Sequence, residues 1–79
     1  MRRNDLDICA DILEIACTGA KKTHLVYKAN INFVVLKKYL KRLFKCGLIE
    51  NQDGMFFTTD EGFSYIERYR NTVLPLTGI

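Results

Sequence analysis

Cationic side chains gather in the middle of this 79-residue chain, and they are the residues whose type and spacing could do chemistry. No acidic residue lies between Glu14 and Glu50, although this interval holds eight lysines and arginines. An ordinary solvated surface mixes the two signs of charge, whereas a run of one sign repels itself unless a polyanion neutralises it. The segment is therefore predicted to meet the phosphates of a nucleic acid rather than to form a plain solvated face.

The densest part of this interval, residues 32–47, has the pattern of a helix with one apolar and one basic side. Asn32 can cap the first turn of this helix, and Gly47 can end it. The apolar side is predicted to collect Leu36, Tyr39, Leu40, Leu43 and Phe44, and the basic side to collect Lys37, Lys38, Lys41, Arg42 and Lys45.

A basic helix of this kind can enter the major groove of duplex DNA. Val34 and Val35 lie near the amino-terminal end of its basic side, where apolar groups can contact thymine methyl groups. The residues predicted to contact base edges or nearby phosphates are Asn32, Val34, Val35, Lys37, Lys38 and Lys41, and those predicted to contact the DNA backbone are Lys21, Lys22, Arg42 and Lys45.

Two helices are expected before the basic helix. Asn4 can cap the first, whose apolar surface is wide enough to pack on the core with one side and on a subunit partner with the other. A break at residues 18–19 precedes a short second helix, which is expected to be capped by Thr23 and to run to about Ala29. The tight turn of residues 30–32 joins it to the basic helix, and this is the pattern of a helix-turn-helix.

The remaining chain is predicted to form a hairpin and a last helix. Two short β-rich runs flank the Asp53-Gly54 turn, and the tip carries no lysine or arginine, so strong phosphate contact is not expected there. The last helix is predicted over residues 60–73, with residues 74–79 as a tail. Its aromatic rows are typical of a core or a dimer interface rather than of a nucleic-acid stacking platform.

The predicted fold class is mainly α with a small β-hairpin (α+β), in the order α-α-α-β-β-α, as a single domain of residues 1–79. The chain resembles winged helix-turn-helix domains, and more narrowly the small archaeal winged-helix DNA-binding proteins of about ten kilodaltons, which are chromatin-associated proteins and transcription regulators. The resemblance rests on Thr23-His24-Leu25-Val26-Tyr27-Lys28-Ala29-Asn30-Ile31-Asn32, Leu36-Lys37-Lys38-Tyr39-Leu40 with Leu43, Gly47-Leu48-Ile49, and Phe57-Thr58-Thr59-Asp60-Glu61-Gly62.

Members of that group typically dimerise through a long carboxy-terminal helix that forms an antiparallel coiled coil. Only about 14 residues separate Thr59 from Pro75 in this chain, so a long arm of this kind is not expected. The resemblance implies a homodimer, and a shorter interface through the first and last helices would serve it.

Other functional classes find little support in the residues. His24 is the only histidine, and no nucleophile motif or glycine-rich phosphate loop is present, so an enzyme is not expected. Cys9, Cys17 and Cys46 are odd in number and lack a CxxC spacing, which predicts no disulfide framework, no metal site and no cofactor. Without a long apolar run or signal segment, the protein is expected in the cytoplasm, associated with the nucleoid, and not in a membrane.

Three functions remain open at this point. The first is a DNA-binding transcription regulator that reads sequence with the helix of residues 32–46. The second is an architectural chromatin protein with little sequence preference, and the third is a protein-interaction module that docks an acidic partner on its basic side. The first is the favoured interpretation.

Overall fold

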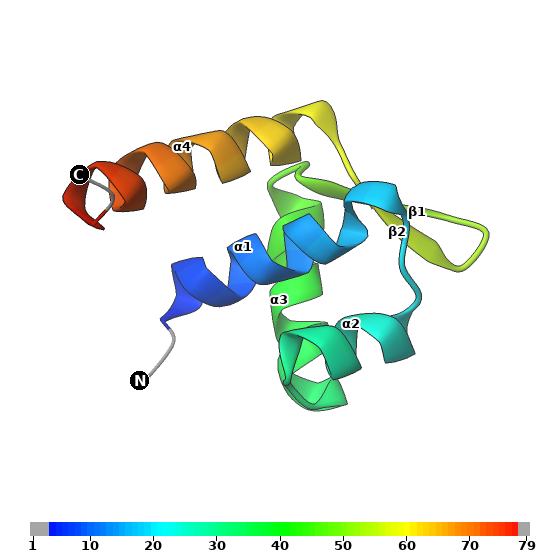
Figure 1. The fold of residues 1–79 in the computed structure, drawn as a ribbon. Coiled ribbons are helices and arrows are strands. Elements are labelled where there is room, and N and C mark those ends of the chain that lie inside the picture. The colour runs from blue at the N-terminus through cyan, green and yellow to red at the C-terminus, as the bar shows by residue number, and fades with distance from the viewer. Residues whose placement is uncertain (1–3, 78–79) are drawn as a thin grey trace.

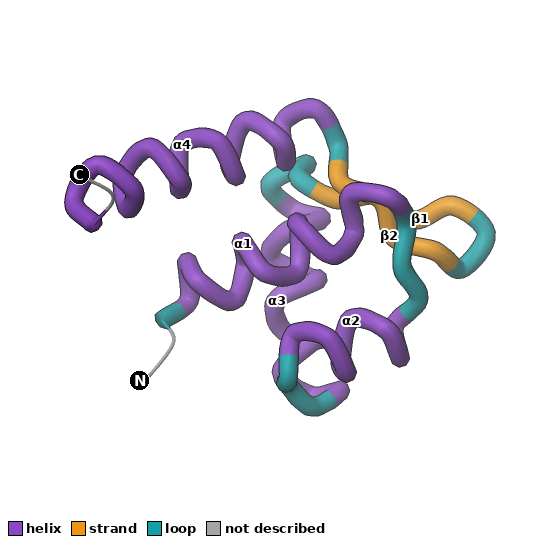
Figure 2. The backbone as a smooth tube through the Cα atoms, viewed as in Figure 1, coloured by secondary structure: helices purple, strands orange, loops and turns teal. Residues whose placement is uncertain are grey.

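The helices and strands follow one another in the predicted order (Figure 1). The computed structural model describes residues 4–77, with side chains described as far as Asn71. Strand structure within this range is confined to the hairpin, and helix makes up most of the rest (Figure 2). The elements are α1 (Asp5–Ile15), a 3-10 turn (Ala16–Thr18), α2 (Lys22–Ala29), α3 (Phe33–Lys45), β1 (Ile49–Gln52), β2 (Met55–Thr58) and α4 (Asp60–Thr77).

Local capping signals set the ends of α1 and α3, as predicted. The Asn4 side chain accepts the backbone N–H of Asp7 at 2.9 Å, and the Asp7 carboxylate accepts the backbone N–H of Asn4, which together form a capping box. The Asn32 side chain accepts the backbone N–H of Val35 at 2.8 Å. Gly47, just past the end of α3, has a φ of 73° and so adopts the left-handed conformation that often follows a helix.

The start of α2 differs from the prediction. Thr23 was expected to cap this helix, but it lies inside the first turn, because the helix begins at Lys22 and Lys21 occupies the cap position. The physical reason is a tertiary contact just upstream: Ala20 bonds to Phe56 of β2 in both directions, with N···O distances of 3.0 and 2.8 Å. The chain leaves this bridge in extended form and enters α2 directly.

That bridge also supports the hairpin, which would be only marginally stable as an isolated pair of strands. The register pairs Ile49 with Thr58, and both side chains are buried. Asp53 and Gly54 form the turn with φ values of 53° and 82°, as the sequence signal for a tight hairpin turn predicts. The bridging residue Ala20, for which no strand pairing was predicted, adds a third backbone segment to this small sheet.

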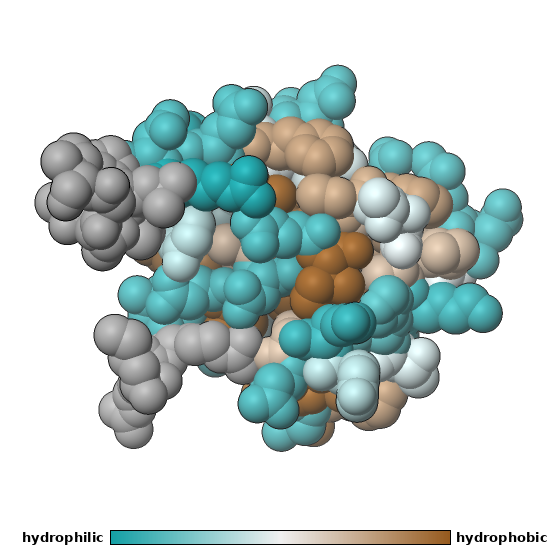
Figure 3. Space-filling view, viewed as in Figure 1, coloured by the Kyte–Doolittle hydropathy of each residue, from teal (hydrophilic) through white to brown (hydrophobic). Residues whose placement is uncertain are grey.

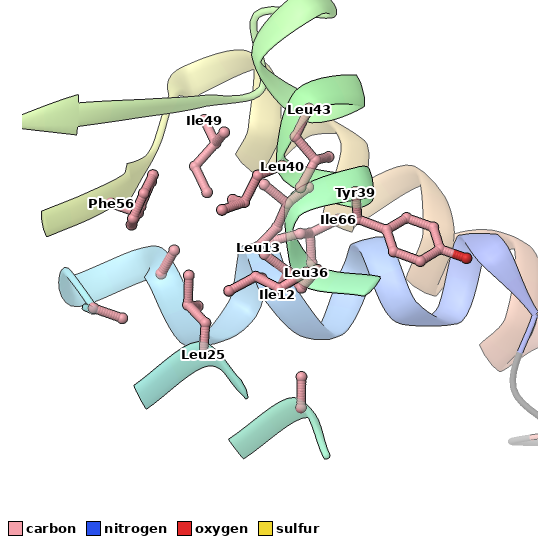
Figure 4. Packing of buried hydrophobic residues seen from close by; sticks show 13 residues of the cluster. Ile12, Leu13, Leu25, Leu36, Tyr39, Leu40, Leu43, Ile49, Phe56 and Ile66 are labelled. Carbon is pink, nitrogen blue, oxygen red and sulfur yellow. The ribbon is translucent and has the colours of Figure 1, made fainter. Parts of the chain in front are cut away.

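The core lies between α1, α3, the hairpin and the first half of α4 (Figure 4). Side chains from all four regions and from α2 meet there, so the elements around α3 are held by shared packing rather than by loops. Hydrophilic side chains cover most of the face seen in Figure 3, and apolar ones gather between α1, α2 and the hairpin. The buried core residues include Ile12, Leu13, Leu25, Leu36, Tyr39, Leu40, Leu43, Ile49, Phe56 and Ile66.

Thr59 and Gly62, which belong to the last segment on which the family resemblance rests, attach the start of α4 to the end of α3. The Thr59 hydroxyl donates to the Gly47 carbonyl at 2.7 Å and accepts the Gly62 N–H at 3.1 Å. A Cβ atom at Gly62 would lie only 2.2 Å from the Leu48 carbonyl oxygen. Glycine is therefore needed at this position because the first turn of α4 packs directly on the backbone that follows α3.

The last helix is longer than predicted. It was expected over residues 60–73, but it continues through Pro75 to Thr77, and residues 78–79 of the predicted tail lie outside the described part of the chain. Proline disfavours a helix interior, but here the lost backbone donor affects only the last turn. Earlier in the helix, the Tyr69 hydroxyl donates to the Asp7 carboxylate and Arg70 pairs with Glu14 at 2.8 Å, so α4 packs along α1 of the same chain.

Candidate nucleic-acid interface

The basic side of α3 is exposed along its whole length. Five cations and one valine line a single shallow hollow of about 640 Å³, and Val34 is 79% exposed at its amino-terminal end. Val35, the second predicted valine, is half-buried against the core and contributes less surface. We call this surface the outer face of α3; it consists of Val34, Lys37, Lys38, Lys41, Arg42 and Lys45.

The two predicted lysines at the start of α2 lie beside the hairpin rather than on the outer face. Lys21 and Lys22 line a hollow next to Asn51 and Gly54 of the hairpin. Lys22 also borders a second hollow, which it shares with Lys37 and Lys41 of α3. The predicted cations are therefore continuous from α3 through α2 to the turn end of the hairpin.

That second hollow, of about 360 Å³, separates α3 from the hairpin and was not recognised in the sequence. Phe44 was predicted on the apolar side of α3, but it is 41% exposed at this hollow, with its ring centroid 5.8 Å from that of Phe56. Phe33, which the sequence analysis did not single out, is 54% exposed there. We call this hollow the hairpin groove; it is lined by Lys22, Phe33, Leu36, Lys37, Leu40, Lys41, Phe44, Asn51 and Phe56.

The helical positions of these phenylalanines could have signalled the groove. Residues 33 and 44 are 11 positions apart, so they lie almost one above the other after three turns. Viewed down the axis of α3, both phenylalanines lie between the apolar side and the basic side of the helix, roughly a quarter turn from the centre of each side. A large apolar side chain at such a boundary can be covered or exposed, and only the position of the hairpin decides which.

On the opposite flank of α3, two cations contact α1 and a buried tyrosine. The Arg42 guanidinium lies 3.3 Å from the Asp5 carboxylate and 5.6 Å from the centre of the Tyr39 ring, and Lys38 lies 5.5 Å from the same ring. The Tyr39 ring is buried, and its hydroxyl points along α1 to donate to Asp5 at 2.5 Å (Figure 4). Arg42, a predicted DNA contact, therefore already has an anionic partner within the chain.

This contact changes the proton affinities of both partners. The Tyr39 hydrogen bond, followed by the Arg42 hydrogen bond, lowers the pKa of Asp5. The same hydrogen bond raises the pKa of Tyr39, because loss of its proton would place two negative charges together. At neutral pH the group is therefore a carboxylate held by a neutral tyrosine and a cationic arginine.

The Asn32 side chain also takes part in a hydrogen bond within the chain. Its side-chain oxygen caps α3 through Val35, which leaves the amide nitrogen as the group that can still donate outward. A bidentate contact to adenine would also need the side-chain oxygen, so Asn32 could make it only by sharing this oxygen between the base and the cap.

Comparison with known proteins places this arrangement in a family. Residues 2–74 match the model of the winged helix-turn-helix family. The chain belongs to this family. A similar solved structure is that of Sso10a-2, a DNA-binding protein from Sulfolobus solfataricus, with a TM-score of 0.78 and 29% sequence identity over 90% of this chain and 79% of that chain. No curated protein matches the sequence.

The predicted family is thus confirmed, and its parts can be named in the structure. In this winged helix-turn-helix, α2 and α3 are the two helices joined by the turn, and the hairpin is the wing. The wing, residues 49–58, carries Glu50 and Asp53 and no lysine or arginine. The positive charge of the surface therefore lies on the helices and not on the wing.

The cysteines and acids of this winged helix-turn-helix form no further site among the described residues. Cys9 and Cys17 are half-buried and Cys46 is exposed, and burial raises the pKa of the Cys9 thiol. No group of histidine, cysteine and acidic side chains that could hold a metal ion occurs in the described part of the chain. Over the same residues, no helix has the length and apolar character to cross a membrane.

Proposed function

We propose that this protein binds double-stranded DNA by inserting the outer face of α3 into the major groove, and that it acts as a transcription regulator. The observation that carries the proposal is the gathering of five cations and the exposed Val34 on one continuous hollow of one helix. A helix fits the major groove, and a surface of one charge sign is suited to the phosphates on either side. The similar protein Sso10a-2, described as a DNA-binding protein, supports this assignment.

The residues divide into those that read bases and those that hold the backbone. Base edges are met from the amino-terminal half of α3, with the valines on thymine methyl groups and the amide nitrogen of Asn32 as a donor. Phosphates are met by the lysines and arginine around them, Arg42 only after leaving Asp5. The set proposed to meet base edges or nearby phosphates is Asn32, Val34, Val35, Lys37, Lys38 and Lys41, and the set proposed to meet only the backbone is Lys21, Lys22, Arg42 and Lys45.

A regulator differs from an architectural chromatin protein in its sequence preference. The exposed Val34 at the end of the outer face favours the regulator, because an apolar contact discriminates thymine from the other bases whereas phosphate contacts do not. Selection of bound sites from a random duplex library tests this point. An enriched motif supports regulation, whereas an unbiased pool would make the protein an architectural DNA coat of the nucleoid.

A homodimer built on α1 and α4 is the second part of the proposal. Leu6 of α1 is 57% exposed and Phe63 of α4 is 42% exposed, so each of these helices presents a large apolar side chain to solvent. A two-fold dimer would favour DNA half-sites about one helical turn apart. Light scattering of the wild type and of Leu6→Glu is expected to give a dimer and a monomer, respectively; a wild-type monomer at every concentration rules this interface out.

The main test reverses charges on the outer face. Lys38→Glu combined with Lys41→Glu is expected to abolish binding to a duplex of about 30 base pairs at low salt, while the circular-dichroism melt stays nearly unchanged. The matched control is Lys28→Glu combined with Arg68→Glu, which reverses two exposed cations elsewhere and gives the same net charge. The proposal fails if both pairs weaken binding equally, and binding of the wild type to an acidic protein but to no duplex would make the basic side a protein-docking surface.

A further inference from the structure

The hairpin groove combines two exposed phenylalanines with lysines, and insertion of the outer face into a duplex does not use this combination. Phe33 and Phe44 lie about 16 Å apart along one side of α3, at a rise of about 1.5 Å per residue. Buried Leu36 and Leu40 form an apolar floor between them. Apolar rings at both ends of an open groove are costly to leave in water, so the groove is suited to a ligand with flat apolar surfaces.

The charges around the groove select an anionic ligand. Lys37 and Lys41 stand on the α3 side and Lys22 at the start of α2 on the other side, while Asn51 of the hairpin adds an amide. None of the described residues that line the groove is acidic, and none of these three lysines forms an ion pair with another described residue. An extended anion can therefore be neutralised from both sides of the groove.

We propose that the hairpin groove binds a single-stranded segment of nucleic acid, with bases stacked on Phe33 and Phe44 and phosphates on Lys22, Lys37 and Lys41. Duplex bases already stack on one another and present only edges, whereas an unpaired strand offers the faces that aromatic rings need. An acidic peptide would meet the same lysines, but it has few flat rings to cover the two phenylalanines.

The proposal goes beyond duplex binding and does not depend on it. Lys38 and Lys45 belong to the outer face and do not line the hairpin groove. Phe33 lines the groove and does not belong to the outer face. Substitutions on the two surfaces can therefore separate the two ligands.

The experiment measures fluorescence anisotropy of a labelled oligothymidylate of about twelve nucleotides and of a labelled duplex, each titrated with the full chain. Phe33→Ala is expected to weaken single-strand binding about tenfold and to change duplex binding less than about twofold. Lys38→Gln combined with Lys45→Gln is expected to do the reverse. Tyr27→Ala removes an exposed aromatic side chain of α2 that lines neither hollow, and it is expected to change neither affinity.

Phe33 is more than half exposed, so the variant is expected to melt like the wild type; Phe33→Trp, which keeps a flat ring, is expected to retain single-strand binding. Failure of the folded wild type to bind the oligothymidylate at low salt overturns the proposal. Equal losses on single strand and duplex for Phe33→Ala would instead make Phe33 a duplex contact. Displacement of the oligothymidylate by oligoglutamate of equal charge would show that the groove is a dock for acidic proteins.

Discussion

The two flanks of α3 carry cations in opposite states. On the α1 flank, Arg42 is paired with Asp5 and lies over the ring of Tyr39, which also has Lys38 close to its face. On the hairpin flank, Lys37 and Lys41 form no ion pair with any described residue. The same helix therefore holds one set of charges within the fold and leaves another set for a ligand.

This difference shows that a count of cations overstates the charge that a surface can use. A paired arginine must leave its carboxylate before it contacts a phosphate. The free energy that it gains on binding is therefore the difference between its interaction with the phosphate and its interaction with the carboxylate. A lysine that faces only water gains the whole interaction and releases counterions from the DNA. The hairpin flank is therefore expected to dominate affinity, although both flanks looked equal in the sequence.

Among variants that compare the two flanks, the largest effect is expected from neutralising the hairpin flank. Lys37→Gln combined with Lys41→Gln is expected to weaken duplex binding by about 10-fold to 100-fold and to reduce the slope of log affinity against log salt by about 1.8, because two phosphate contacts are lost. Anisotropy titrations across a salt series measure both quantities. The hairpin groove also loses two of its three lysines, so single-strand binding is expected to fall as well.

The contrasting variant removes the internal pair without changing the net charge. Asp5→Asn combined with Arg42→Gln is expected to alter duplex affinity less than about threefold, because Arg42 reaches a phosphate only by giving up Asp5 and the variant lacks both of these contacts. A loss as large as that of the lysine pair would mean that the phosphate contact of Arg42 far outweighs its contact to Asp5, and the distinction between the flanks would not hold.

A smaller effect of opposite sign is expected when only the acid is removed. Asp5→Asn leaves Arg42 without its carboxylate and takes one negative charge from the edge of the outer face. Duplex affinity is expected to rise about threefold to tenfold, with a salt slope steeper by about 0.9. Unchanged affinity and slope would indicate that Arg42 cannot reach a phosphate even when it is released.

Much of the fold could be predicted because its signals are local. Asn4 and Asn32 cap helices with their own side chains, and Asp53-Gly54 has the chemistry of a tight hairpin turn, so neighbouring residues suffice to place these ends. The basic side of α3 could be predicted for the same reason, since helical spacing alone puts its lysines together. Signals of this kind need no knowledge of the rest of the chain.

The features that the sequence did not reveal depend on contacts between distant residues. Thr23 failed as a cap because the Ala20 bridge to the hairpin sets where α2 begins. Phe44 lies at the boundary of the apolar side, and its exposure depends on where the wing stands. The contact between Asp5 and Tyr39 joins residues 34 positions apart, and no spacing rule links a first-turn acid to a tyrosine on another helix.

The smallest expected effect concerns stability and acts through the contact between Asp5 and Tyr39. Tyr39→Phe is expected to lower the melting temperature by a few degrees at neutral pH, because the Asp5 carboxylate loses a hydrogen bond.

The stabilisation from this hydrogen bond depends on pH, and the two pKa shifts give the direction of the dependence. The pKa of Asp5 is lowered from 3.8, so the contribution of Asp5 to the free energy of unfolding is fully present above pH 3.8. It is lost as the pH falls through the pKa that Asp5 has in the folded protein. The pKa of Tyr39 is raised from 10.0, so the contribution of Tyr39 to the free energy of unfolding is fully present below pH 10.0. It is lost as the pH rises through the pKa that Tyr39 has in the folded protein.

Melting curves of the wild type and Tyr39→Phe should therefore differ most between about pH 4 and pH 10 and converge on either side. Tyr69→Phe gives a matched comparison on α4, since its hydrogen bond to Asp7 raises the pKa of Tyr69 to about 12 and ties α1 in the same way. Neither variant removes the Asp5 partner of Arg42, so both are expected to leave duplex affinity unchanged. A gain in duplex affinity for Tyr39→Phe alone would show that the tyrosine, and not the carboxylate by itself, keeps Arg42 on the α1 flank.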